Sequence, residues 1–481
     1  MRGVGVKSGP AAAPLDGWFR PSSQKPRLGS DVVVLDRAVD DIVEQYIATN
    51  TNSPTRKSSA ASLLLPTRDH LRQKLRTPQS LVQEFAALEA LQLKLNATHS
   101  CEVGKLALKA NLNRYLDVLP YDHNRITLGT TNTAPVQDQE EEKEEESESD
   151  FAVDDNTTTT NNNNKHTRHF GNVCANMVRA AFGSSSTSPR KENESAVRSA
   201  SDLTEEQRLR IATYINASPI TCTDPSTSSS WQYIAAQGPL PQTTHSFWQM
   251  IVEQRISSVV MVTGLVENKK KKCHQYFASK LGTKLTVDDG TVVKTVAVEE
   301  VGVGLVMRRL LWERKTAGIG GAAVETSTRW ECDHYHFTSW PDHGVPSSPA
   351  VLLELCALMR KHEQQHDDNV PILVHCSAGI GRSGVFCVLD SIARRLYGFG
   401  KAYGTSSGTD PSLLASDVGP TNKLMTALAV DEMVATLRNQ RAGMVQTPEQ
   451  YVFCYRAVLH LVEAVLERCG VGGDEDDNVV Q

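Results

Sequence analysis

The sequence lacks long apolar runs and closely paired cysteines. No stretch of the 481 residues reaches the roughly 18 apolar residues of a membrane span, and the start, MRGVGVKSGP, lacks the apolar core of a signal peptide. The ten cysteines are scattered and include no Cys-x2-Cys pair, which is typical of reduced thiols. We therefore expect no integral membrane segment and a cytoplasmic location, with a nuclear location left open.

The chain also has little net charge for its length. The formal net charge is −6, and much of the acidity lies in the run at residues 140–150. Because the positive and negative charges of the remaining residues nearly balance, the composition argues against a general nucleic-acid binder. On a prior of about 100–200 residues per domain, the length allows two or three domains or one large domain with insertions.

Three low-complexity stretches interrupt the apolar pattern. Residues 129–200 hold the acidic run, an Asn/Thr tract and a Ser-rich piece, residues 316–328 are rich in Gly and Ala, and residues 398–424 are rich in Gly and Ser. Such compositions bury too little apolar surface to offset chain entropy. We predict that all three are disordered insertions.

Both ends of the chain are predicted to lie outside the folded domain. Residues 1–75 are rich in Ser, Pro, Arg and Lys and are expected to be a flexible extension, in which residues 32–47 have the apolar spacing of a docking or transient helix. Thr77 and Pro78 form the pattern of an N-cap followed by a first-turn proline. The expected boundaries are 76–469 for the domain and 470–481 for an acidic tail.

A glycine-bearing loop joins a predicted buried strand, which ends at His375, to a predicted helix at residues 385–396. Five residues separate Cys376 from Arg382, enough for a tight loop whose backbone N–H groups point inward beside those of the helix start. These dipoles suit a dianion and favour thiolate at Cys376, and Arg382 adds a planar pair of donors for phosphoryl oxygens. The pattern indicates attack by sulfur on a phosphate ester.

The string HCSAGIGRSG at residues 375–384 resembles the signature loop of the protein tyrosine phosphatase family, His-Cys-x5-Arg-Ser/Thr, in its tyrosine-specific, non-receptor branch. The resemblance covers residues 76–469 apart from the insertions. It implies one large α/β domain with a highly twisted mixed β-sheet flanked by helices. The other matching strings are NRYLDVLPYDH at 113–123, YINAS at 214–218, YIAAQGPLP at 233–241, WPDHG at 340–344 and QRAGMVQTPEQY at 440–451.

The resemblance implies hydrolysis of phosphotyrosine through a phosphocysteine on Cys376. Asp342 is the implied general acid, and then the base, and Gln446 is implied to place the attacking water. Activity that needs thiolate and protonated Asp342 together is expected to have a bell-shaped pH profile. The other implied catalytic residues are Arg382, which binds phosphate, Ser383, which stabilises the departing thiolate, and His375, which orients the loop.

The resemblance also implies the substrate-binding residues. Tyr115 is implied to line a deep cleft and stack on the substrate ring, and Asp117 to bind the substrate backbone. Such a cleft leaves phosphoserine too short to reach the cysteine. No cofactor or metal is implied, the implied partners are tyrosine-phosphorylated proteins, and the oligomeric state is left open. The remaining implied binding residues are Ser377, Ala378, Gly379, Ile380, Gly381, Lys272, Glu267 and Gln450.

Other classes share parts of this pattern. A pseudophosphatase that only binds phosphotyrosine usually lacks the general acid, the cysteine or the arginine. This sequence has all three residues, Asp342, Cys376 and Arg382. A dual-specificity or lipid phosphatase has the Cys-x5-Arg spacing without the strings around Tyr115 and Gln450. His343 stands where the family often has phenylalanine. A further hypothesis makes the insertions the functional part of an interaction scaffold.

Overall fold

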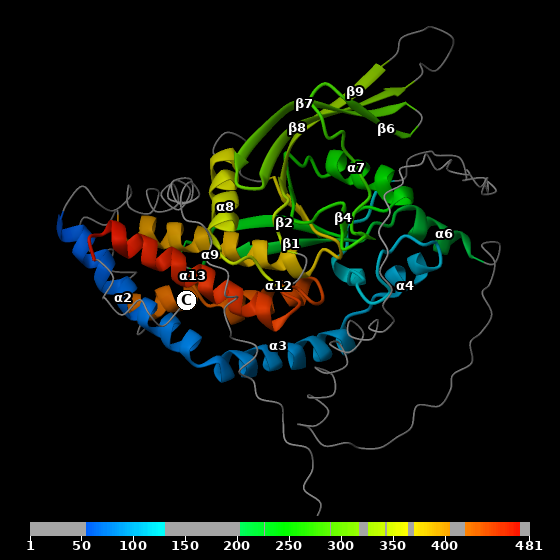
Figure 1. Ribbon diagram of the computed structural model, residues 1–481. Helices are drawn as coiled ribbons and strands as arrows, with labels where there is room; N and C mark the ends of the chain where they lie inside the picture. Colours follow the sequence, from blue (N-terminus) through cyan, green and yellow to red (C-terminus); the bar gives the residue numbers. More distant parts are fainter. Residues whose placement is uncertain are drawn as a thin grey trace, which may run out of the picture.

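The computed structural model of the protein describes most of the predicted domain (Figure 1). The described residues are 54–129, 203–225, 227–288, 290–316, 326–341, 344–363, 370–404 and 419–471. Within these ranges, no helix combines the length and the apolar composition needed to cross a membrane.

A mixed sheet of eight strands forms the centre of the fold. In spatial order the strands are β1 (Ala217–Thr223), β2 (Ser230–Ala236), β10 (Ile372–His375), β3 (Ser258–Met261), β9 (Thr326–Phe337), β8 (Leu305–Thr316), β7 (Thr291–Gly302) and β6 (Lys284–Asp288). β2, β10, β3 and β9 are parallel neighbours, and both edges are antiparallel. In Figure 1, β7 to β9 rise steeply away from β1 and β2, so the sheet is strongly twisted.

Helices flank the sheet, as the sequence predicted for an α/β domain (Figure 1). The helices on one side are α2 (Pro54–Arg76), α3 (Pro78–Thr98), α8 (Ala350–Glu363), α9 (Gly381–Gly404), α11 (Pro420–Ala427), α12 (Val430–Gln440) and α13 (Pro448–Arg468). The remaining elements are α4 (Glu102–Leu108), α6 (Glu205–Ala212), α7 (Thr244–Glu253), the 3-10 turns η2 (Asp122–Asn124) and η4 (Pro241–Thr243), and the hairpin strands β4 (Val266–Glu267) and β5 (Lys270–Lys271).

Strand β10 shows how the sheet separates two apolar cores. Every residue of β10 is buried, as expected for a parallel strand covered on both faces. Because side chains alternate along a strand, Ile372 and Val374 join the core formed with α9 and α13, whereas Leu373 joins the core formed with α7.

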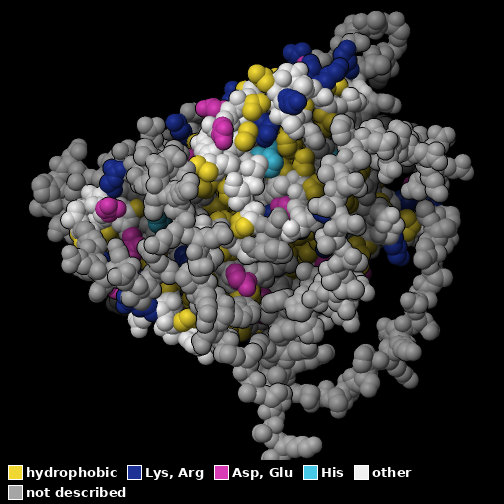
Figure 2. Space-filling view, in the orientation of Figure 1, with side chains coloured by type: hydrophobic (Ala, Val, Ile, Leu, Met, Phe, Trp, Pro, Cys, Tyr) yellow, Lys and Arg dark blue, Asp and Glu magenta, His cyan; other side chains and the backbone are white. Residues whose placement is uncertain are grey.

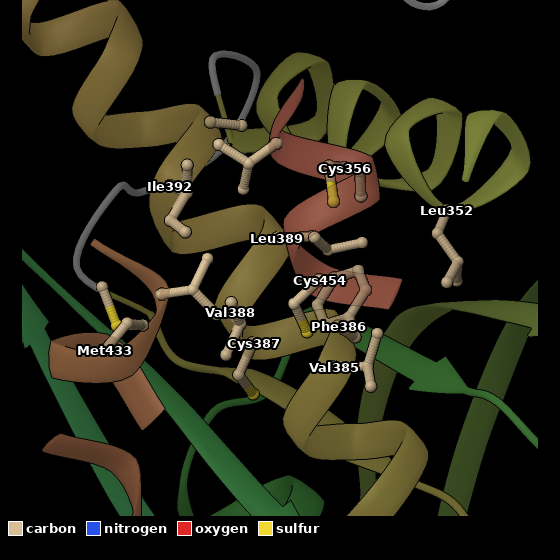
Figure 3. Packing of buried hydrophobic residues seen from close by; sticks show 14 of the residues in the cluster. Leu352, Cys356, Val385, Phe386, Cys387, Val388, Leu389, Ile392, Met433 and Cys454 are labelled. Carbon is tan, nitrogen blue, oxygen red and sulfur yellow. The ribbon is translucent and has the colours of Figure 1, made fainter. Parts of the chain in front are cut away.

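Helix α9 is buried on all sides from Ser383 to Ala393 because it lies in the centre of the larger core. Figure 3 shows Val385, Phe386 and Leu389 of α9 beside Cys356 of α8 and Cys454 of α13. These five side chains are at most 1% exposed. Because other elements enclose this part of α9, the N-terminus of the helix is fixed firmly in the fold.

The C-terminal ends of the parallel strands meet at one edge of the sheet. His375, the last residue of β10, is in register with Ala236 at the end of β2 and with Met261 at the end of β3. The loops that follow these strands therefore lie together, and such edges are the usual ligand-binding edges of α/β sheets.

The flexible N-terminal extension was predicted to end at residue 75, but its last part is helical. Residues 54–76 form α2, which packs on α13 and α11 and buries Leu64 and Leu71. The leucines of this stretch give the helix an apolar face, which the polar composition of the whole segment concealed. Residues 32–47, where we predicted a docking or transient helix, lie outside the described residues.

Two of the predicted insertions are shorter than expected. β8 and β9 continue into residues 316–328, where Thr316 is paired with Thr326, so only residues 317–325 lie outside the described part. Likewise, α9 and α11 occupy the ends of residues 398–424 and leave residues 405–418. Packing and strand pairing override the loop composition at these ends. Apart from Gly129, the predicted insertion at 129–200 lies outside the described residues.

Candidate active site

The loop at residues 376–381 connects the end of β10 to the start of α9, as predicted. Gly379 has φ +73°, and a Cβ there would lie 2.1 Å from the Ala236 carbonyl oxygen, so the tight curve requires glycine. The Gly379 N–H donates to Cys376 Sγ at 3.2 Å. Cys376 is 4% exposed, so the sulfur that accepts this N–H is buried within the loop.

Arg441 fixes the opposite side of the same loop. Its guanidinium donates to the carbonyl oxygens of Ala378 at 3.1 Å and Gly379 at 2.9 Å. Because C=O and N–H point in opposite directions across a trans peptide, holding these carbonyls outward turns the following N–H groups inward. The side chains of Asn216 and Ser218 hold Arg441 in turn, and burial lowers its pKa to about 10.

Arg441 was missed as a site residue by the sequence analysis. It stands in the QRAGMVQTPEQY string, but that string was used only for Gln446 and Gln450. No sequence pattern marked Arg441, because its burial (1% exposed) becomes evident only in the fold. A buried guanidinium requires several acceptors, and here the loop carbonyls supply them.

Glu267 and Arg382 form a two-pronged ion pair, with N–O distances of 2.5 and 2.9 Å. Glu267 also accepts from Thr263 Oγ1 and the Gly264 N–H. Burial raises the pKa of Glu267, but the hydrogen bonds from Arg382 and Gly264 outweigh it and bring the pKa below its ordinary value. The carboxylate is therefore ionised and orients the guanidinium, which also lies 5.5 Å from the centre of the Trp340 ring.

Tyr115 reaches the loop through Ser377. The Ser377 hydroxyl donates to the Lys272 carbonyl at 2.9 Å, so the Tyr115 hydroxyl is the donor in its 2.8 Å bond to Ser377 Oγ. Tyr115 is half-buried, whereas Asp117 is exposed on the same segment. The structure thus brings Tyr115, Ser377 and the Lys272 backbone together at the rim of the loop.

His375 lies behind the loop as a neutral group. Its Nδ1 faces the Cys376 carbonyl at 3.2 Å and must donate, so Nε2 accepts from the Tyr276 hydroxyl at 2.7 Å. Burial lowers the pKa of His375 to about 3, with a further contribution from His336. Tyr276 in turn accepts from His334 at 2.8 Å. Both ring nitrogens of His375 are therefore used in hydrogen bonds that orient the loop, and the neutral ring has no proton to give to a substrate.

The glutamine segment lies against the start of α9. The Val445 N–H donates to the Ile380 carbonyl at 3.2 Å. A Cβ at Gly381 would lie 3.0 Å from the side-chain nitrogen of Gln450 and 3.2 Å from Oε1 of Gln446, so both glutamines adjoin the loop. Gln450 Oε1 also accepts the Gln446 N–H at 2.9 Å.

Ser383 is fully buried, and its hydroxyl has no hydrogen-bond partner among the described residues. Burying a hydroxyl without a hydrogen-bond partner costs free energy. The Ser383 hydroxyl is therefore available to donate to a negative charge that develops nearby during a reaction.

Asp342 and His343 lie outside the described residues, so the role of Asp342 stays a prediction from the sequence. The residues around them are placed: Trp340 is 5% exposed and donates through Nε1 to the Gly344 carbonyl at 3.2 Å. This bond joins residues 340 and 344, and the Trp340 ring lies beside the Arg382 guanidinium. In the described part of the chain, no group of three or more His, Cys, Asp or Glu side chains is arranged to hold a metal ion.

The chain resembles known proteins over most of the described residues. The family model for protein-tyrosine phosphatase matches residues 193–405 and 413–460, more than half of the chain. Over 249 residues the chain is 34% identical to human tyrosine-protein phosphatase non-receptor type 13. The aligned segment is 52% of this chain but only 8% of that protein. The protein-tyrosine-phosphatase PTP1 of Arabidopsis thaliana is 28% identical over 399 residues, 82% of each chain.

Among solved structures, the catalytic domain of human protein tyrosine phosphatase non-receptor type 18 matches 80% of this chain and 96% of that chain, with 22% identity and a TM-score of 0.49. The family expected from the HCSAGIGRSG string is confirmed by the match to the family model. This chain belongs to the protein-tyrosine phosphatase family.

Proposed function

We propose that this protein hydrolyses phosphotyrosine in proteins to tyrosine and phosphate through a phosphocysteine intermediate, in cytoplasmic signalling. The observation that carries the proposal is the position of Cys376: its sulfur accepts the Gly379 N–H at 3.2 Å, inside a loop that ends at a guanidinium fixed by Glu267. Backbone N–H groups, a helix start and Arg382 together provide donors for a bound dianion.

In the first step, Cys376 Sγ attacks phosphorus, forming the S–P bond as the bond from phosphorus to the tyrosyl oxygen breaks. The N–H groups of the loop and Arg382 stabilise the charge on the phosphoryl oxygens. Asp342 gives its proton to the departing oxygen, which improves a poor leaving group. Trp340, held beside Arg382, anchors the segment that carries Asp342.

In the second step, water attacks phosphorus and the S–P bond breaks. Gln446 and Gln450, which adjoin Gly381, are placed to orient that water, and Asp342 takes its proton. The departing sulfur becomes a thiolate, which the buried, unpaired hydroxyl of Ser383 stabilises by a hydrogen bond. Neither step needs a metal ion or an organic cofactor.

Selectivity for phosphotyrosine follows from the rim of the loop. Tyr115 is tied to Ser377 by a 2.8 Å hydrogen bond, and its ring forms a wall beside the phosphate position. A phenyl ring spans this depth, whereas the single carbon of phosphoserine does not. Asp117, exposed on the same segment, is available to the backbone N–H groups of a bound peptide.

The test is phosphate release from a phosphotyrosine peptide and from a matched phosphoserine peptide. We expect wild type to hydrolyse only the first, Cys376→Ser to be inactive but to bind the peptide, and Asp342→Ala to lose about 10²–10⁴-fold in kcat with little change in binding.

Different failures point to different classes. A wild-type protein that binds the phosphotyrosine peptide without hydrolysing it is a phosphotyrosine-binding module. Equal rates on both peptides indicate a dual-specificity phosphatase. Full activity of Cys376→Ser would refute the proposed nucleophile.

A further inference from the structure

Val445, the residue before Gln446, has an unusual backbone conformation. Its φ is +57°, and in the described ranges it is the one β-branched residue with a positive φ. The branched side chain makes this conformation costly, and such residues persist only where surrounding contacts hold them. Val445 is fully buried, whereas Gln446 is exposed. The direction in which the chain leaves Val445 therefore decides where the Gln446 side chain can reach.

Helix α9 packs directly against the backbone of Val445. The Val445 N–H donates to the Ile380 carbonyl at 3.2 Å. A Cβ at Gly384 would lie 2.4 Å from the Val445 nitrogen, so only glycine allows the two backbones to approach this closely. The position of Val445 is therefore tied to the start of α9 and to the loop that carries Cys376.

Arg438 of α12 fixes the orientation of the same residue. Its guanidinium donates to the Met444 carbonyl at 3.0 Å and to the Val445 carbonyl at 2.9 Å. These carbonyls belong to the two peptide groups on either side of the Val445 Cα. Because each peptide group is planar, fixing the Val445 carbonyl also fixes the direction of the Gln446 N–H. One side chain thus holds both peptide planes that define the unusual conformation.

Helix α3 holds Arg438 in turn, and Figure 1 shows α3 beside α12. The guanidinium is fully buried, and its Nη1 lies 2.9 Å from Glu89 Oε1, an ion pair that is not aligned as a hydrogen bond. The Phe85 ring centre lies 5.3 Å from the guanidinium carbon. The Gln92 side chain also accepts the Gly443 N–H at 2.9 Å. Because a buried charge requires a counter-charge, Glu89 stabilises Arg438 in this position.

We propose that Arg438, paired with Glu89 of α3, is a positioning residue for the second step, the hydrolysis of the phosphocysteine. The inference rests on the proposed function, in which Gln446 orients the attacking water. Arg438 holds the backbone at Val445, and that backbone directs Gln446. The first step depends on the loop at residues 376–382, whose shape other residues fix. Loss of Arg438 should therefore slow the second step far more than the first.

The experiment measures the two steps separately with para-nitrophenyl phosphate. In single-turnover rapid mixing with enzyme in excess, release of nitrophenol gives the rate of phosphocysteine formation, and release of phosphate gives the rate of its hydrolysis. The variants are Arg438→Met and Glu89→Gln, and the matched control is Glu313→Gln. Glu313 pairs with Arg329 at the outer end of β8 and β9, where Figure 2 shows Lys and Arg side chains gathered. The control therefore removes an ion-pair carboxylate from another part of the fold.

We expect Arg438→Met to slow hydrolysis by about 10²-fold, because a displacement of roughly 1 Å at a catalytic group has an effect of that size. Phosphocysteine formation should change little, so the phosphorylated enzyme accumulates and its added mass is detectable. Glu89→Gln removes only the counter-charge of Arg438, so its hydrolysis rate should fall by roughly 2- to 5-fold. Glu313→Gln should match wild type in both steps.

A double variant tests whether Arg438 acts through Gln446. In Arg438→Met/Gln446→Ala the hydrolysis rate should be no lower than in Gln446→Ala alone, because the group that Arg438 positions is already absent. Additive losses in the double variant overturn the proposal, and so does equal slowing of both steps in Arg438→Met. If thermal unfolding shows that Arg438→Met is not folded, Glu89→Gln decides, and a hydrolysis rate equal to that of Glu313→Gln overturns the proposal.

Failure of the proposed function gives a different result. If wild type releases neither nitrophenol nor phosphate, the proposed function is wrong. Amide hydrogen exchange at residues 443–446 then measures the positioning without turnover, because their N–H groups are protected only while the local structure is closed. Exchange should be faster in Glu89→Gln than in wild type and in Glu313→Gln. Equal exchange in all three proteins overturns the role of Arg438 and Glu89.

Discussion

The inner and outer sides of the loop at residues 376–382 each hold an arginine, and the two are bound differently. On the inner side, Arg382 pairs with the carboxylate of Glu267 and remains 16% exposed. On the outer side, Arg441 is 1% exposed and bonds only to neutral oxygens, two of them loop carbonyls. A guanidinium oriented by one carboxylate keeps donors for a ligand, whereas one surrounded by carbonyls determines where the backbone lies.

The comparison separates binding from positioning within one loop. The inner side presents N–H groups, the sulfur of Cys376 and Arg382 to a ligand. The outer side fixes the direction of those N–H groups through Arg441 and His375, which a ligand does not contact. Substitutions on the inner side should therefore change activity more than stability, and substitutions on the outer side should change both.

The largest expected effect is that of Arg382→Lys on the inner side. Lysine keeps the charge that pairs with Glu267 but loses the two parallel donors, so kcat/KM for a phosphotyrosine peptide should fall by about 10²–10³-fold. The free energy of unfolding, measured with urea, should change little. Activity near the wild-type level would contradict a phosphate-binding role for Arg382.

On the outer side, Arg441→Met should lower both stability and activity. The substitution leaves the Ala378 and Gly379 carbonyls without their donors, at a cost of about 1–3 kcal/mol for each buried group left unpaired. We expect a lower free energy of unfolding together with a lower kcat. A stable variant with wild-type kcat would show that the loop holds its shape without Arg441. Arg441→Lys, which keeps the charge but carries its donors on a single nitrogen, should lie between wild type and Arg441→Met in both properties.

A smaller effect is expected from pH on the outer side. The folded-state pKa of His375 is about 3, below its ordinary value of 6.5, so the unfolded chain binds a proton first as pH falls. Stability from this group is complete above about pH 6.5 and decreases toward pH 3, by up to about 1.4 kcal/mol per pH unit. Urea unfolding at several pH values measures this slope. His375→Asn should reduce it, and an identical slope in that variant would refute the assignment.

The smallest expected effect is that of Tyr115→Phe at the rim. The phenyl ring remains, and only the 2.8 Å hydrogen bond to Ser377 is lost. A net hydrogen bond contributes about 0.5–1.5 kcal/mol, so kcat/KM should fall by roughly 2- to 12-fold. Tyr115→Ala removes the wall as well and should cost much more with phosphotyrosine peptides. Equal effects of the two substitutions would contradict the role of the ring.

The candidate site was largely predictable because its residues lie in short contiguous strings. Cys376 and Arg382 share one loop, and the flanking strand and helix were evident from apolar periodicity. Glu267 was assigned to the site only through the family resemblance, because its partner Arg382 is 115 positions away in the chain. Arg441 was not predicted, since nothing in the order of residues shows which carbonyls a buried guanidinium meets.

The boundaries of the fold were predicted less well than its centre. Composition marked residues 54–75 as flexible and residues 326–328 as part of an insertion, but the first belong to α2 and the second to β9. Leu64 and Leu71 gain their burial from α13, which is nearly four hundred residues away in the chain. Local composition gives no information about that contact. An argument from composition therefore assigns such ends of helices and strands to loops.

The sequence by itself determined the family, the α/β class and the loop that carries Cys376, because the chemistry of a thiol, a guanidinium and inward N–H groups depends on their spacing along a few residues. The tertiary structure alone decided which groups surround that loop. Long-range packing brought Arg441 to its outer side and Glu89 of α3 to the buried Arg438. Contacts between residues that are distant in the chain depend on the whole fold, and no local pattern specifies them.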